Sequence, residues 1–172
     1  MIITETPRLR ITDWQAEDWR DFKSLSADPE VMHHITGGVV WDDEATQKFV
    51  LRQIENQQKW GICRWKLVEK ASEKLAGFCG LGMFGTTGDL EIGWWILREL
   101  WGKGLATEAA QAVYRYALTE LKLERIISVA VPENLASFRV MQKIGLALEQ
   151  VTTGGALGIS QDVPVHVYSN QV

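Results

Sequence analysis

The sequence predicts a single α/β domain in which a mixed sheet of about seven strands is flanked by helices. Its 172 residues are the length of one domain and are enough to bury a core without disulfides or metals. Strand-like and helix-like patterns follow one another without an interdomain linker or a repeat, so residues 1–172 are expected to fold together. One long helical stretch separates two strand-like runs, and such a crossover connects parallel strands, whereas the short turns elsewhere connect antiparallel ones.

The first third of the chain is expected to contain one strand and two helices. Residues 6–11 alternate polar and apolar side chains, as a half-buried strand does. Residues 14–25 carry apolar side chains on one helical face, and Asp28-Pro29 ends that helix because proline disfavours a helical residue before it. Residues 32–38 have no clean period and are expected to form a loop, which is followed by a helix over about 43–58.

The remainder of the chain is expected to supply most of the sheet. A charged turn separates two apolar runs that predict an antiparallel hairpin, and the chain should close with a second hairpin around Gly154-Gly155. The expected strands are 62–69, 75–84, 90–97, 125–131, 146–151 and 163–167, and the expected helices are about 103–121 and 134–144.

Composition narrows the range of partners and compartments. The net charge of −4 argues against nucleic acid or an anionic membrane as the main partner. No run approaches the roughly 18 apolar residues of a membrane helix, and no secretory signal is visible at the start of the chain. We therefore expect a cytoplasmic protein that binds neither nucleic acid nor membranes.

The two cysteines, Cys63 and Cys79, lie in apolar, strand-like runs. They show neither C-x-x-C spacing nor a disulfide framework, so buried thiols are expected. A nucleophilic role for one of them stays open as an alternative. No metal site is expected, since the neighbouring His33 and His34 lack the further ligands that a metal would require.

The clearest local signal is a glycine turn between a strand and a helix, at Gly102-Lys103-Gly104. The first turn of a helix has N–H groups without intrahelical partners, and the helix dipole adds partial positive charge there, so anions bind at this end. Glycines let a phosphate approach the backbone and permit positive φ angles. The turn lacks the nucleotide-triphosphate motif G-x-x-x-x-G-K-[ST]. It also lacks the dinucleotide fingerprint G-x-G-x-x-G, because position 107 holds Thr107 instead of glycine.

Residues 101–106, WGKGLA, resemble the acyl-CoA pyrophosphate loop of the GNAT superfamily of N-acetyltransferases, whose motif is [Q/R]-x-x-G-x-[G/A]. Trp101 departs from the Gln or Arg of that motif, but W-G-K-G-x-A-T-E-A is similar to the branch that contains ribosomal-protein-alanine N-acetyltransferases. Residues 131–146 are similar to the family's second motif, N-x-x-S…K-x-G-[FL]. The resemblance covers about residues 8–168 and implies the GNAT fold.

The resemblance also implies the activity, which is transfer of an acetyl group from acetyl-CoA, the co-substrate, to a primary amine in a ternary complex. The acceptor would be a protein or peptide N-terminus or a small amine, and the enzyme a monomer or homodimer. The residues expected to bind the cofactor are Ile96, Leu97, Trp101, Gly102, Lys103, Gly104, Leu105, Ala106, Thr107, Asn134 and Ser137.

The reaction requires a base for the amine and a proton for the departing thiolate. Glu91 is the candidate base, because strand alternation places it on the same face as Gly93 and Trp95, just before the cofactor loop. Ser137 is the candidate acid or hydrogen-bond donor to the CoA sulfur, whose thiol pKa is near ~8.5. Trp95 is expected in the acceptor pocket, with His33 and His34 lining the acceptor site.

Two other functions stay open at this point. A non-catalytic acyl-CoA-binding or sensor domain would keep the loop and the Asn134 helix start but would have no proton path to an amine. A cysteine acyl-enzyme route would require Cys63 or Cys79 to be a reactive thiolate, and Arg64 is the charged neighbour that could activate Cys63.

Overall fold

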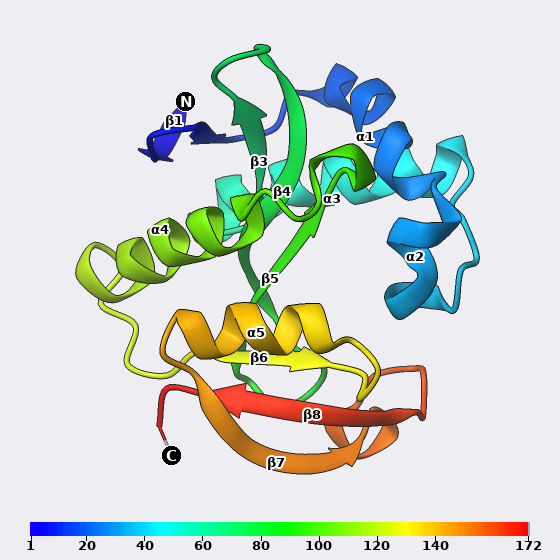
Figure 1. The fold of residues 1–172 in the computed structure, drawn as a ribbon, viewed down its shortest axis with the longest axis vertical. Coiled ribbons are helices and arrows are strands. Elements are labelled where there is room, and N and C mark those ends of the chain that lie inside the picture. Colours follow the sequence, from blue (N-terminus) through cyan, green and yellow to red (C-terminus); the bar gives the residue numbers. More distant parts are fainter. Residues whose placement is uncertain (172) are drawn as a thin grey trace.

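An eight-stranded mixed sheet forms the centre of the computed structural model, which describes residues 1–171 (Figure 1). Neighbouring strands are antiparallel except β5 and β6, which are parallel as the long helical crossover between them predicts. In spatial order the strands are β1 (Ile2–Glu5), β2 (Leu9–Thr12), β3 (Arg64–Glu69), β4 (Lys74–Met83), β5 (Leu90–Ile96), β6 (Ile127–Ala130), β8 (Pro164–Ser169) and β7 (Ala147–Thr153).

Helices cover both faces of the sheet. Figure 1 shows α4 and α5 in front of the sheet and α3 behind it. The helices are α1 (Trp19–Ser26), α2 (Pro29–Thr36), α3 (Asp43–Trp60), α4 (Leu105–Thr119) and α5 (Leu135–Lys143), with short 3₁₀ turns η1 (Ala16–Asp18), η2 (Arg98–Leu100) and η3 (Gly155–Leu157).

The core lies where these helices meet the sheet. Alternate residues of the strands, such as Leu9 and Ile11 of β2, are fully buried. Helix α4 presents a stripe of mostly small apolar residues to β4 and β5, and these residues are Leu105, Ala109, Ala110, Val113 and Ala117. The predicted single α/β fold with a mixed sheet is therefore confirmed.

The start of the chain differs from the prediction. Residues 6–11 were expected to form one strand, but β2 begins at Leu9 and a further strand, β1, precedes it and pairs with it antiparallel. β1 is a short edge strand with partly exposed side chains, so it lacks the apolar alternation that marks a strand in sequence. The sheet has eight strands instead of about seven for this reason.

Residues 32–38, expected to be a loop, belong largely to helix α2. Asp28-Pro29 follows the end of α1 at Ser26, as predicted, and it also begins the next helix. The Asp28 carboxylate accepts a hydrogen bond from the Glu30 N–H at 2.9 Å, and proline is well suited to the first helical position. The loop prediction was wrong because the same dipeptide can end one helix and start another, and its consequence is that both histidines lie on a helix.

The described residues, 1–171, include no helix that is both long and apolar enough to cross a membrane.

Candidate functional site

The sheet opens between the two parallel strands. β5 and β6 are paired at one register position, Glu91 with Ile127, and beyond it they diverge (Figure 1). The buried Ser128 hydroxyl donates to the Ile92 carbonyl at 2.9 Å and also links the two strands near this position. Alternation directs the backbone groups of every second β5 residue beyond this position, such as Ile96, toward the open side, where no strand lies beside them.

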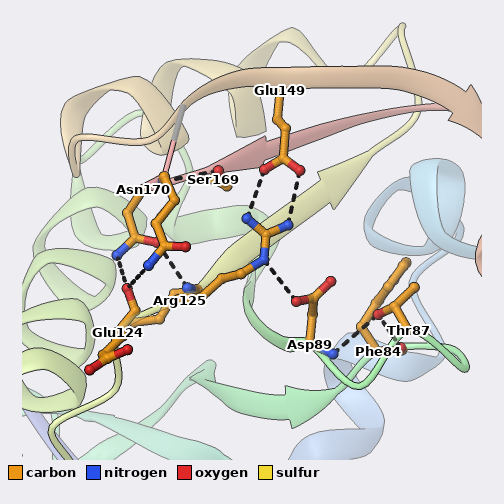
Figure 2. Close-up of polar contacts among 10 residues, drawn as sticks. Phe84, Thr87, Asp89, Glu124, Arg125, Glu149, Ser169 and Asn170 are labelled. Carbon is orange, nitrogen blue, oxygen red and sulfur yellow. Dashed lines mark hydrogen bonds and ion pairs between the residues drawn. The ribbon is translucent and has the colours of Figure 1, made fainter.

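The closed end of this fork is held by the guanidinium of Arg125. Figure 2 shows Arg125 between two carboxylates, with Nε donating to Asp89 at 2.9 Å and both terminal nitrogens donating to Glu149 at 2.9 and 3.0 Å. These contacts tie the segments just before β5 and β6 to the edge strand β7. Hydrogen bonds from Arg125 and from Ser169 lower the pKa of the Glu149 carboxyl.

A cavity of about 830 Å³ fills the open part of the fork and is lined mainly by β5, β6, α2, the first turn of α4 and the length of α5. It brings together most of the residues that the sequence singles out, from segments up to a hundred residues apart. Those that line it are His33, His34, Glu91, Trp95, Ile96, Trp101, Gly102, Gly104, Leu105, Ala106, Thr107, Asn134 and Ser137. Leu97 and Lys103 are not among the lining residues.

The glycine turn enters α4 as the sequence indicates. Gly102 and Gly104 have φ angles of 73° and 77°, in the left-handed region that favours glycine, and Gly104 is the N-cap of the helix. The first turn of α4, from Leu105 to Thr107, therefore directs its end toward the cavity. A backbone cradle of this kind suits a phosphate group.

The end of β5 is fixed by bonds that involve three residues expected to contact the cofactor, Ile96, Leu97 and Trp101. The Trp101 indole N–H donates to the Ile96 carbonyl at 2.7 Å, so the tryptophan that departs from the motif locks the loop onto the strand. Leu97 donates its N–H to Ala76 and accepts from Leu100, both at 2.9 Å. Its backbone groups are therefore already bonded within the protein, whereas the N–H of Ile96 lies on the open side.

The start of α5 also faces the cavity. The Asn134 side chain accepts a hydrogen bond from the Ser137 N–H at 3.1 Å and caps the helix, as predicted. Ser137 and Asn134 both line the cavity, so the start of α5 forms part of its wall.

Glu91 lies at the inner end of the cavity in an ion pair with Arg64, which sequence reasoning did not assign to the site. Arg64 also donates through Nη1 to the carbonyls of Gly80 and Glu91 at 3.0 and 2.9 Å. A Cβ at Gly93 would lie 2.7 Å from Arg64 Nη1, so the absence of a side chain makes room for the guanidinium. In the sheet Arg64 is paired with Gly80, and Gly80 is paired with Gly93. These two glycines are the feature of the sequence that could have indicated Arg64 as a site residue.

Aromatic rings form the wall of the cavity near Glu91. Trp95 is stacked on Phe49 with ring centroids 6.0 Å apart and an angle of 11° between the rings, and it packs against Trp41 at 5.2 Å. Phe49, Phe78 and Trp95 line the cavity. His33 and His34, on α2, also line the cavity, and their exposed rings have centroids 4.8 Å apart.

Comparison with known proteins agrees with this geometry. Residues 8–147 match the family described as Acetyltransferase (GNAT) domain. The chain belongs to the GNAT acetyltransferase family. It is 32% identical over 144 residues, 84% of this chain and 82% of the other, to YnaD of Bacillus subtilis (strain 168), which is named as an uncharacterized N-acetyltransferase.

Solved GNAT structures share the whole fold. A GNAT-family acetyltransferase from Bacillus anthracis superimposes with a TM-score of 0.82 at 30% identity, over 98% of this chain and 97% of the other. RimL, a ribosomal L7/L12 alpha-N-protein acetyltransferase in complex with coenzyme A, gives a TM-score of 0.80 over 98% of this chain and 97% of the other. At 17% identity it shows likeness of fold alone.

The cysteines of this GNAT domain lie outside the cavity. Cys63 and Cys79 are 1% and 0% exposed, and burial raises the pKa of both thiols well above the ordinary value. A buried thiol is a poor nucleophile because it is not ionised. The structure therefore supports the prediction of buried structural thiols and argues against the acyl-enzyme route. Within residues 1–171 there is no cluster of three or more metal-ligating side chains.

Proposed function

We propose that this GNAT protein is an acetyl-CoA-dependent N-acetyltransferase, which transfers the acetyl group to a primary amine by direct attack in a ternary complex. The observation that carries the proposal is the cavity itself. One continuous space connects the glycine turn before α4, which suits a diphosphate, with the carboxylate of Glu91 and the hydroxyl of Ser137.

The fork and the loop suit the elongated form of acetyl-CoA. In this proposal the backbone of Gly102 to Thr107 binds the diphosphate, and the open side of β5 at Ile96 offers the hydrogen bonds that a pantetheine arm requires. The bound cofactor supplies a reactive thioester. Leu97 and Lys103 contribute less than the sequence suggests, since neither lines the cavity.

Glu91 is the proposed proton acceptor. An amine is partly or mostly protonated at neutral pH, with a pKa of about 10.4 for Lys or about 8 for an α-amino group, so a base must remove its proton directly or through water. Among the hydrogen bonds of residues 1–171, Glu91 uses Oε2 for Arg64, and Oε1 accepts none. Arg64 thus fixes the carboxylate while leaving one oxygen for the amine or for water.

Ser137 is the proposed hydrogen-bond donor to the departing sulfur. Its N–H is bonded to Asn134, which holds the serine at the first turn of α5 with its side chain at the cavity wall. A CoA thiolate, with a thiol pKa of about 8.5, is a fair leaving group that one hydroxyl can still assist.

The acceptor is proposed to be a primary amine on a protein or peptide N-terminus or on a small molecule. It would enter beside Trp95, with His33 and His34 at the mouth. The preference for an N-terminus comes from the WGKGLATEA sequence of residues 101–109. The fold likeness to RimL is compatible with that preference and does not decide it.

The alternative is a non-catalytic acyl-CoA sensor. The ion pair of Glu91 with Arg64 favours it in one respect, because a carboxylate bound by a guanidinium is less available as a base. A Glu91→Gln variant separates the two, with Glu44→Gln on the exposed surface of α3 as the matched control. For an enzyme we expect turnover to fall by about 10²-fold or more while the Kd for CoA stays near the parent value. Binding of CoA by the parent without turnover of any amine would favour the sensor.

A further inference from the structure

Arg8 joins the beginning of the chain to the glycine turn, about a hundred residues away. Its Nη1 donates to the Lys103 carbonyl at 2.8 Å, and its Nε donates to the Glu108 carboxylate at 2.6 Å. Its own backbone N–H donates to the same carboxylate at 3.0 Å, and the Thr6 hydroxyl does so at 2.5 Å. The turn and the first turns of α4 are thus bonded to the segment that precedes β2.

The carboxylate of Glu108 is the centre of this group. Burial acts to raise the pKa of Glu108, but hydrogen bonds from Thr6 and Arg8 outweigh burial, so the pKa is lowered. Glu108 is on α4, four residues after the N-cap Gly104, and its N–H donates to the Gly104 carbonyl at 3.1 Å. Arg8 therefore contacts both the peptide before Gly104 and the helix after it.

The direction of the bond to Lys103 determines where the next N–H points. In a trans peptide the carbonyl and the following N–H point in opposite directions. Arg8 and Lys103 are absent from the cavity lining, whereas Gly102 and Gly104 belong to it. Holding the Lys103 carbonyl on the Arg8 side consequently turns the Gly104 N–H away from Arg8, toward the cavity.

A glycine turn requires such a restraint. Gly102 and Gly104 adopt left-handed φ angles, but glycine populates positive and negative φ almost equally, so their own preferences do not hold the turn in one shape. The planar guanidinium has donors in a fixed fork and can bond the carbonyl and the carboxylate together, which a single ammonium cannot do with the same geometry. A loop held in its binding shape loses less entropy when its ligand binds.

We propose that Arg8 is a positioning residue for the diphosphate of acetyl-CoA, acting from behind the loop by fixing the Gly104 peptide. The inference rests on the proposed function, because it requires that the turn binds that diphosphate. Arg8 touches neither the substrate nor the reacting atoms. Its loss should weaken binding of the diphosphate portion and leave the chemical step intact.

The test compares Arg8→Gln and Arg8→Lys with the parent, and Arg10→Gln serves as the control. Arg10 is two residues away, and its ion pair with Glu73 lies at a partly exposed surface. We expect the Kd for CoA, measured by calorimetry, to rise about tenfold in both Arg8 variants and to stay unchanged in the control. Arg8→Lys can still pair with Glu108, so it keeps the fold if Arg8→Gln does not.

A second readout separates positioning from a general loss of stability. The ratio of kcat/KM for acetyl-CoA to that for S-acetylpantetheine, which lacks the diphosphate, should fall about tenfold in the Arg8 variants at unchanged kcat. Parent-like CoA affinity in folded Arg8→Lys, or an unchanged ratio, would overturn the inference. If the parent itself fails to bind CoA, the proposed function is wrong. If the parent binds CoA and the Arg8 variants bind it equally well, only the inference about Arg8 is wrong.

Discussion

Replacing Gly104 by valine should impair cofactor binding through backbone strain. Gly104 has φ 77° and ψ 7° at the N-cap of α4, and a left-handed conformation costs an L-residue about 1–2 kcal/mol, with β-branched residues the least tolerant. The nearest heavy atom to a Cβ at this position is Arg8 Nη2 at 3.7 Å, an ordinary contact. The valine is therefore expected to move the turn out of its binding shape without a clash, and about 1.4 kcal/mol corresponds to a tenfold loss of affinity.

The matched control is Gly61→Val at the end of α3. Gly61 has φ 69° and ψ 8°, a Cβ there would meet nothing within 4 Å, and the residue does not line the cavity. Both variants should lose similar stability in thermal unfolding. In a calorimetric titration with acetyl-CoA, Gly104→Val should bind at least about tenfold more weakly and Gly61→Val like the parent. Parent-like binding by folded Gly104→Val would refute the assignment of the turn to the diphosphate.

Four further outcomes are expected. The double variant Cys63→Ala, Cys79→Ala should retain turnover in a thiol-release assay where it is folded, and loss of kcat at intact CoA binding would revive the acyl-enzyme route. Ser137→Ala should lower kcat with little change in the Kd for CoA, which stopped-flow and calorimetry can separate. Trp101→Phe loses the indole bond to the Ile96 carbonyl and should weaken CoA binding about two- to tenfold by calorimetry, since one hydrogen bond contributes about 0.5–1.5 kcal/mol. Hydrogen bonds from Arg125 and Ser169 lower the folded-state pKa of Glu149, so the stabilisation they give is present above the unfolded-state pKa of about 4.3. It is lost as the pH falls through the folded-state pKa. In Glu149→Gln, the free energy of unfolding measured in urea should therefore depend less on pH below about 5.

The parts of the site that local sequence determines could be predicted. Gly104 precedes α4, and Asn134 caps α5, because caps and positive φ angles depend on residues within one turn of the chain. The parallel pairing of β5 and β6 also follows from the helix between them. The sequence alone thus indicates the two helix starts that border the cavity.

The remaining features depend on contacts between distant segments. The fork opens because β5 and β6 pair at one position. The residue pattern of a single strand does not indicate where the neighbouring strand separates from it. The pair of Arg64 and Glu91 joins β3 to β5 across β4, and Arg8 reaches Lys103 from the start of the chain. Helix α2 was missed because Asp28-Pro29 is compatible with a helix end and with a helix start.

An amine panel with acetyl-CoA, monitored by thiol release, tests the central claim most directly. The panel should contain peptides with N-terminal Ala or Ser, polyamines and aminoglycosides. We predict acetyl-CoA-dependent turnover of at least one primary amine, and loss of that turnover in Glu91→Gln while CoA binding is retained. Turnover confined to small amines would correct the preference for an N-terminus, and tight CoA binding without turnover of any amine would contradict the assignment as an N-acetyltransferase.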